Sequence, residues 1–117
     1  MEKNLSIYCI TDLESPFLES LNYNLVGVGK NQFTEKYINC ANGENIQNKE
    51  EYYSELTFHY WYWKNIMKTE NAKWVGFCQK RRFWIKSQSS KLDITKSNLT
   101  DHLLVEPEEI WKNYESI

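Results

Sequence analysis

No stretch of about 18 apolar residues occurs in this sequence of 117 residues, which argues against a transmembrane helix. The first apolar run, residues 5–10, is too short for the hydrophobic core of a signal peptide. The net charge of −2 gives no general attraction to nucleic acid or to an anionic membrane. We therefore expect a soluble cytoplasmic protein with no integral membrane segment and no nucleic-acid partner.

Ligand-binding motifs of several common classes are also absent. The three cysteines and two histidines show neither a CxxC pair nor zinc-ligand spacing, which argues against a disulfide framework and a structural zinc site. The sequence contains no Walker P-loop, no GxSxG and no HExxH. Gly27 and Gly29 are not followed by the third glycine of a dinucleotide-binding loop. We predict no metal site and no cofactor, and keep a divalent manganese or magnesium ion as the alternative.

Aromatic residues, by contrast, are abundant: they make up 15% of the sequence and concentrate between Tyr52 and Trp84. Such a cluster favours core packing. The alternative is a surface on which sugars or bases stack, because Tyr and Trp combine a flat apolar face with a polar tip. With 41% hydrophobic and 26% charged residues, the composition is that of a globular domain.

The hydrophobic pattern predicts an α/β fold with a mainly parallel sheet and flanking helices. Strands are expected at 5–11, 24–29 and 73–78, with a short one at 103–105, and residues 31–42 are expected to be irregular. Asn48 and Glu51 have the spacing of a capping box, so a helix is predicted from 49 to 68. Its apolar stripe is formed by Tyr52, Leu56, Tyr60, Trp63 and Met67, and is widened by Tyr53, Trp61 and Ile66. A final helix is expected at 108–114.

The segment Gln79-Lys80-Arg81-Arg82 follows a buried-type strand and is the clearest candidate for chemistry. It is compatible with a solvated turn or with an anion site, because arginine binds phosphate through a planar, bidentate fork. Thr11 and Asp12 end the first strand and are further candidates, since ligands of α/β proteins bind at the carboxyl ends of strands. Asp12 and Glu14 have a spacing that can hold a divalent cation, although a polar loop explains them as well. Glu55 is a surface carboxylate, an acceptor for a sugar hydroxyl, or a partner for Arg81 or Arg82.

Four blocks of the sequence resemble a bacterial family long described as a domain of unknown function. They are residues 43–46 (GENI), 53–57 (YSELT), 60–65 (YWYWKN) and 75–84 (VGFCQKRRFW). Family members show GDNIS, YCELTALYWIWKN and YIGLCHYRRYF in this order. The family occurs in gene clusters for capsular polysaccharide and lipo-oligosaccharide, and is regarded as glycosyltransferase-like with a GT-A-type, Rossmann-like fold.

The resemblance implies that residues 1–117 form a single domain corresponding to the donor-binding half of such a protein, so that the fold is expected to be incomplete. It implies a nucleotide-sugar donor and a glycan or lipid-linked acceptor, with a hexosyltransferase-type reaction if a complete domain is formed. The positions that match the family motifs and are expected to bind the donor are Thr11, Gly29, Asn45, Glu55, Arg81 and Arg82. Tyr60 and Trp63 are candidates for stacking on a sugar.

Other positions depart from the family pattern. The histidine that follows the family's cysteine is replaced by Gln79, and the tyrosine after it by Lys80. The aspartate of GDNIS is replaced by Glu44, and the histidine after the first-strand threonine by Asp12. No catalytic residue is assigned, and no DxD motif is found to hold manganese or magnesium. The alternative function is a non-catalytic module that binds carbohydrate or another protein.

Overall fold

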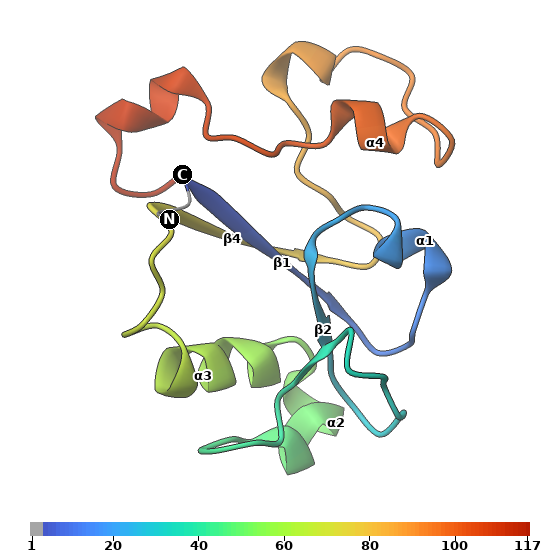
Figure 1. Ribbon diagram of the computed structural model, residues 1–117, viewed down its shortest axis with the longest axis vertical. Coiled ribbons are helices and arrows are strands. Elements are labelled where there is room, and N and C mark those ends of the chain that lie inside the picture. Colours follow the sequence, from blue (N-terminus) through green and yellow to red (C-terminus); the bar gives the residue numbers. More distant parts are fainter. Residues whose placement is uncertain (1–3) are drawn as a thin grey trace.

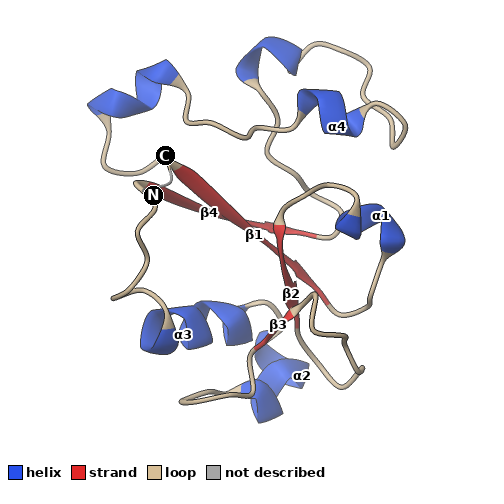
Figure 2. Cartoon of the chain, in the orientation of Figure 1, coloured by secondary structure: helices blue, strands red, loops and turns tan. Residues whose placement is uncertain are grey.

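The computed structural model describes residues 4–117 and centres on a sheet of four parallel strands in the order β3-β2-β1-β4 (Figure 1; β3 is labelled in Figure 2). The strands are β1 (Leu5–Thr11), β2 (Asn24–Gly27), β3 (Ile38–Asn39) and β4 (Trp74–Gln79). The predicted α/β fold with a parallel sheet is confirmed. Because β2 and β4 flank β1 on opposite sides, the direction of winding reverses between β1 and β4, and this is where α/β proteins bind ligands.

Strand β1 runs through the middle of two hydrophobic cores. Ile7 and Cys9 pack into the core on one face of the sheet, and Tyr8 and Ile10 pack into the core on the other. Successive side chains of a strand point to opposite faces, so a strand covered on both sides has a nearly continuous run of apolar residues. The run LSIYCIT has this character, which explains why the strand was predictable.

Short helices cover both faces of the sheet (Figure 2). The helices are α1 (Pro16–Glu19), α2 (Glu50–Tyr53), α3 (Leu56–Asn65) and α4 (Leu99–His102), with 3-10 turns η1 (Gln47–Lys49), η2 (Ser87–Ser89) and η3 (Glu109–Asn113). Helix α3 packs on one face through Phe58, Trp61 and Tyr62. Leu18 of α1 and Leu99 of α4 belong to the core on the opposite face.

The single helix predicted from 49 to 68 is wrong, because the structure divides it into η1, α2 and α3. The break lies at Ser54, whose φ of 50° and ψ of −123° are incompatible with a helix. Helix α2 begins after Lys49 without a side-chain cap, so the predicted capping box of Asn48 and Glu51 is also wrong. The break changes the direction of the chain and lets α3 lie against the sheet independently of α2.

Most of the predicted apolar stripe faces solvent instead of the core, and of its members only Trp61 is buried among residues 4–117. Tyr52, Leu56, Trp63 and Met67 are all exposed, and the buried residues of α3 are Thr57, Phe58, Trp61 and Tyr62. The segment is apolar around most of its circumference, so the sequence offers two possible stripes. Packing against the rings of Tyr8 and Phe77 on the sheet selects the second one.

Four smaller expectations also differ from the structure. Residues 103–105 do not form a strand: Leu103 makes one antiparallel bridge to Ile85 before the chain turns away. The expected helix at 108–114 is a 3-10 turn, and the region 31–42 contains the two-residue strand β3. β2 stops at Gly27, before the predicted end of that strand at residue 29. Within residues 4–117, no helix combines the length and apolar character needed to cross a membrane.

The carboxylate of Glu70 joins β1 to α3, because the hydroxyl groups of Tyr8 and Tyr62 both donate to its Oε1 atom, at 2.7 and 3.2 Å. Burial, reinforced by Glu70, raises the pKa of Tyr8 to about 12, and burial raises the pKa of the Cys40 thiol to about 12.

Raising the pH is therefore expected to destabilise the fold. A raised pKa in the folded state means that the stabilisation from Tyr8 is complete below about pH 10 and is lost as the pH rises towards 12. The loss from Tyr8 should be about 1–2 kcal/mol, measured by urea denaturation at successive pH values. Tyr8→Phe should make the decline shallower, whereas Tyr52→Phe, at a residue 81% exposed, should not change it. Equal declines in both variants would contradict the assignment.

Candidate functional site

A cavity of about 450 Å³, here called the strand-end cavity, opens where the carboxyl ends of β1 and β4 meet. Residues 10–12, at the end of β1 and just after it, and residues 79–82, at the end of β4 and just after it, line the cavity. Val28, Glu50, Ser54 and Glu55 complete the lining. The cavity thus lies at the point of the sheet where the winding reverses, and its size is within the range of small-molecule sites.

The cationic segment 79–82 forms a tight turn at the end of β4. The backbone N–H of Arg82 donates to the carbonyl oxygen of Gln79 at 3.0 Å, and the N–H of Gln79 donates to the oxygen of Arg82 at 3.3 Å. The N–H of Lys80 donates to the oxygen of Ile10 at 3.2 Å, which holds the turn against β1. The local hydrogen bonds therefore present Lys80 and Arg81 at the tip of the turn, above the sheet edge.

The three cations of this turn differ in their partners. Lys80 forms an ion pair with Asp12, and this contact holds the pKa of the Asp12 carboxyl below its usual value. Arg81 and Arg82 are exposed, and no ion pair within residues 4–117 joins either of them to a carboxylate. Two guanidinium groups therefore remain available to an anion, and guanidinium groups bind phosphate bidentately.

The break between α2 and α3 brings acidic and hydroxyl groups to the opposite wall. Glu50 begins α2, while Ser54 and Glu55 lie at the break. A backbone hydrogen bond at its own N–H, followed by the Ser54 hydroxyl, lowers the pKa of Glu55. Glu55 is therefore ionised at neutral pH and is available as a hydrogen-bond acceptor.

Thr11 lines the cavity, but its hydroxyl group is already engaged. The Oγ1 atom donates to the carbonyl oxygen of Leu13 at 2.7 Å and accepts from the N–H of Leu13 at 3.2 Å. The side chain is buried at 2% exposure. Its clearest contribution is to fix the loop that carries Asp12, which in turn positions Lys80.

Gly29 lies just behind the cavity wall. A Cβ atom at Gly29 would lie 3.3 Å from the carboxylate carbon of Glu50, and the φ of +90° is one that glycine tolerates best. The carbonyl oxygen of Gly29 accepts a hydrogen bond of 2.9 Å from Gln47. Gly29 is not part of the cavity lining. Any effect of Gly29 on donor binding therefore depends on the position of Glu50, which does line the cavity.

Asn45 organises a turn instead of facing the strand-end cavity. Its Nδ2 atom donates to the carbonyl oxygens of Ala41 and Gly43, at 3.0 and 2.8 Å. Its Oδ1 atom accepts from the N–H of Gln47 at 3.1 Å. All of these contacts are local, and they account for this motif position through the shape of the loop.

Tyr60 and Trp63, the candidates for sugar stacking, are on the outer side of α3 and outside the cavity lining. The hydroxyl of Tyr60 donates to Glu44 at 2.6 Å. The Nζ atom of Lys64 lies 4.0 Å from the centroid of the Trp63 ring, so a cation already covers one of its faces.

The structure therefore brings together Thr11, Glu55, Arg81 and Arg82, and leaves Gly29, Asn45, Tyr60 and Trp63 outside. Sequence reasoning missed Glu50 and Ser54, which come to the cavity only because the chain breaks between α2 and α3. Among residues 4–117 there is no group of three or more His, Cys, Asp or Glu side chains suited to holding a metal ion.

The four sequence blocks described above can now be compared with known proteins. A family model described as a domain of unknown function, DUF4422, matches residues 6–116. The chain belongs to this family. Neither the curated proteins nor the solved structures include a significant match. The DUF4422 match covers every strand-end residue named here, so the strand-end cavity is built within the family's own domain.

Proposed function

We propose that this DUF4422 chain is glycosyltransferase-like and binds a nucleotide-sugar donor for the synthesis of bacterial surface polysaccharide. The observation that carries the proposal is the strand-end cavity, in which cations and hydrogen-bonding carboxylates meet at the reversal point of a parallel sheet. The motifs shared with a family regarded as GT-A-type add the expected donor class and a hexosyl transfer to a glycan or lipid-linked acceptor.

The arginines suit the diphosphate of such a donor. Arg81 and Arg82 are adjacent and without an ion-pair partner in the described part of the chain, so binding a diphosphate breaks no existing ion pair of theirs. A positive group at this place also stabilises the charge that develops on the leaving diphosphate during sugar transfer. Arg81 and Arg82 are the residues that we assign to this role.

The opposite wall suits the sugar. Glu50 and Glu55 offer carboxylate oxygens, and Ser54 offers a hydroxyl that donates or accepts. Sugar hydroxyls need such partners, because a ligand hydroxyl that loses water without gaining a hydrogen bond binds poorly. The cavity therefore provides a cationic end and a hydrogen-bonding end.

A titration of the chain with UDP-glucose and with GDP-mannose tests the proposal. We expect saturable binding, followed by tryptophan fluorescence or calorimetry, that is the same with manganese and with a chelator, because the arginines neutralise the diphosphate. Absence of binding by both nucleotide sugars up to about millimolar concentration would contradict the proposal. A requirement for manganese would contradict only the part assigned to the arginines.

A second candidate, a carbohydrate-binding or protein-interaction module, is favoured by the exposed aromatic side chains along α2 and α3. Tyr52, Tyr53 and Trp63 all reach solvent there. The same titration separates the two candidates when glycan fragments without a nucleotide are included. Glycan binding that is lost in Trp63→Ala and retained in Arg81→Ala would favour this second candidate.

A further inference from the structure

A second and larger cavity, here called the apolar cavity, lies against the strand-end cavity. Its volume is about 760 Å³, and Thr11, Lys80 and Arg81 line both cavities. The tip of the cationic turn is therefore a ridge between two spaces. A ligand whose anionic part rests on this ridge can extend into both.

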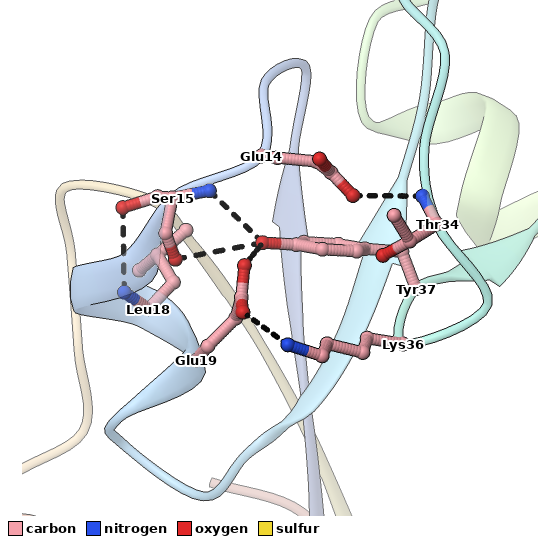
Figure 3. Close-up of polar contacts among 7 residues, drawn as sticks. All are labelled: Glu14, Ser15, Leu18, Glu19, Thr34, Lys36 and Tyr37. Carbon is pink, nitrogen blue, oxygen red and sulfur yellow. Dashed lines mark hydrogen bonds and ion pairs between the residues drawn. The ribbon is translucent and has the colours of Figure 1, made fainter.

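The two cavities differ in charge. The strand-end cavity carries as many carboxylates as cations. The charged side chains of the apolar cavity are Lys80, Arg81, Lys96 and a single carboxylate, Glu14. Glu14 is directed away to the segment beyond β2, where it accepts a hydrogen bond of 2.7 Å from the N–H of Thr34 (Figure 3). The side of the ridge that faces the apolar cavity is therefore the more favourable side for a phosphate group.

The apolar cavity also offers aromatic rings. Phe17 and Phe83 are half-buried, and their rings meet edge to face at 6.3 Å. The Nζ atom of Lys96 lies 5.1 Å from the centroid of the Phe17 ring. Planar bases bind by stacking on aromatic side chains, an interaction that accepts any base because every base has a π-face.

A hydrogen-bond network holds the wall formed by α1 in place (Figure 3). The hydroxyl of Tyr37 donates to Glu19 at 2.7 Å and accepts from the N–H of Ser15 at 2.9 Å. Lys36 adds an ion pair of 3.0 Å with Glu19. Since these contacts fix the start of α1, they also fix Phe17, so the cavity has the preformed character of a binding site.

We propose that the apolar cavity receives the nucleoside of the donor, with the diphosphate on the cationic turn at Arg81 and Arg82 and the sugar in the strand-end cavity. This assignment rests on the proposed function and adds an orientation to it. Ring stacking places the base, the ridge places the charge, and the carboxylates across the ridge place the sugar hydroxyls.

Nuclear Overhauser effects between UDP-glucose and the chain test this orientation. The uracil protons should give contacts to the rings of Phe17 and Phe83, and the glucose protons should give none to them. Contacts between the uracil protons and the methyl groups of Val28, which lines the strand-end cavity, would overturn the orientation and leave the proposed function intact. If neither UDP-glucose nor GDP-mannose binds, both proposals fail together.

Substitution of Phe83 gives an independent readout. Phe83→Leu keeps an apolar side chain in the core, and it should weaken UDP binding about tenfold through lost stacking while leaving inorganic pyrophosphate binding unchanged. Phe33→Leu is the matched control, because Phe33 is also a half-buried phenylalanine but lines neither cavity. Equal UDP affinity in the Phe83 and Phe33 variants overturns the assignment, whether or not nucleotide sugars bind.

Discussion

Phe58→Ala is expected to lower the free energy of unfolding by about 3–5 kcal/mol. Phe58 has no exposed surface, and its ring lies within about 6 Å of the rings of Tyr8, Trp61, Tyr62 and Phe77. Truncation removes the contacts of this ring with Tyr8 and Phe77 on the sheet and leaves a cavity that the surrounding rings cannot fill. Because small domains are stable by about 5–15 kcal/mol in total, the loss should be visible as a large shift of the urea midpoint.

Tyr52→Ala is the matched control, since it truncates an aromatic residue of the predicted stripe that the structure exposes at 81%. Its effect should stay within about 0.5 kcal/mol. Comparison of the Phe58 and Tyr52 variants decides which stripe of residues 52–67 faces the sheet. Comparable losses in the two variants, or a loss below about 1 kcal/mol in Phe58→Ala, would contradict the packing described here.

The two stripes show what the sequence can and cannot determine. β1 was predictable because both of its faces are buried, so its apolar run leaves no choice of face. The segment 52–67 is apolar around most of its circumference, and the choice of face depends on Tyr8 and Phe77, which are distant in sequence. A local pattern cannot contain that information, so the existence of a helix was predictable and its orientation was not.

The candidate site also has one part that could be predicted from the sequence and one part that could not. The cationic turn was recognisable because it follows directly on a buried strand, and the ends of parallel strands meet at one edge of a sheet. Glu50 and Ser54 were not recognisable from the sequence. They reach the cavity because the helix breaks at Ser54, which has a positive φ although it is not a glycine. Such a conformation is stabilised by tertiary packing and has no local sequence signal.

Gly29 and Asn45 show a further limit. Both match the family motifs, yet their contacts in the structure shape loops: Gly29 leaves room for Glu50, and Asn45 ties its turn together. A motif position identifies a residue type that the fold needs at that place, without saying whether it touches a ligand. Their expected contact with the donor remains a prediction, and the cationic turn is the sharper place to test the site.

Arg81→Ala and Arg82→Ala are each expected to weaken the binding of UDP-glucose about 10- to 100-fold, because a hydrogen bond to a charged group contributes about 1.5–3 kcal/mol. Both side chains lie on the surface of the cavity and are exposed, so their removal should leave the urea midpoint unchanged. Calorimetric titration measures the affinity, and a urea curve for each variant verifies the fold.

The identity of the cation should matter as well as its charge. Arg81→Lys retains the charge but loses the bidentate fork, so it should recover only part of the affinity that Arg81→Ala loses. Lys68→Ala removes an exposed positive charge outside the cavity and should leave the affinity unchanged. An equal loss in Lys68→Ala would mean that the ligand responds to the overall charge of the chain. Full affinity in both arginine variants would remove the turn from the binding site, and with it the observation on which the proposed function rests.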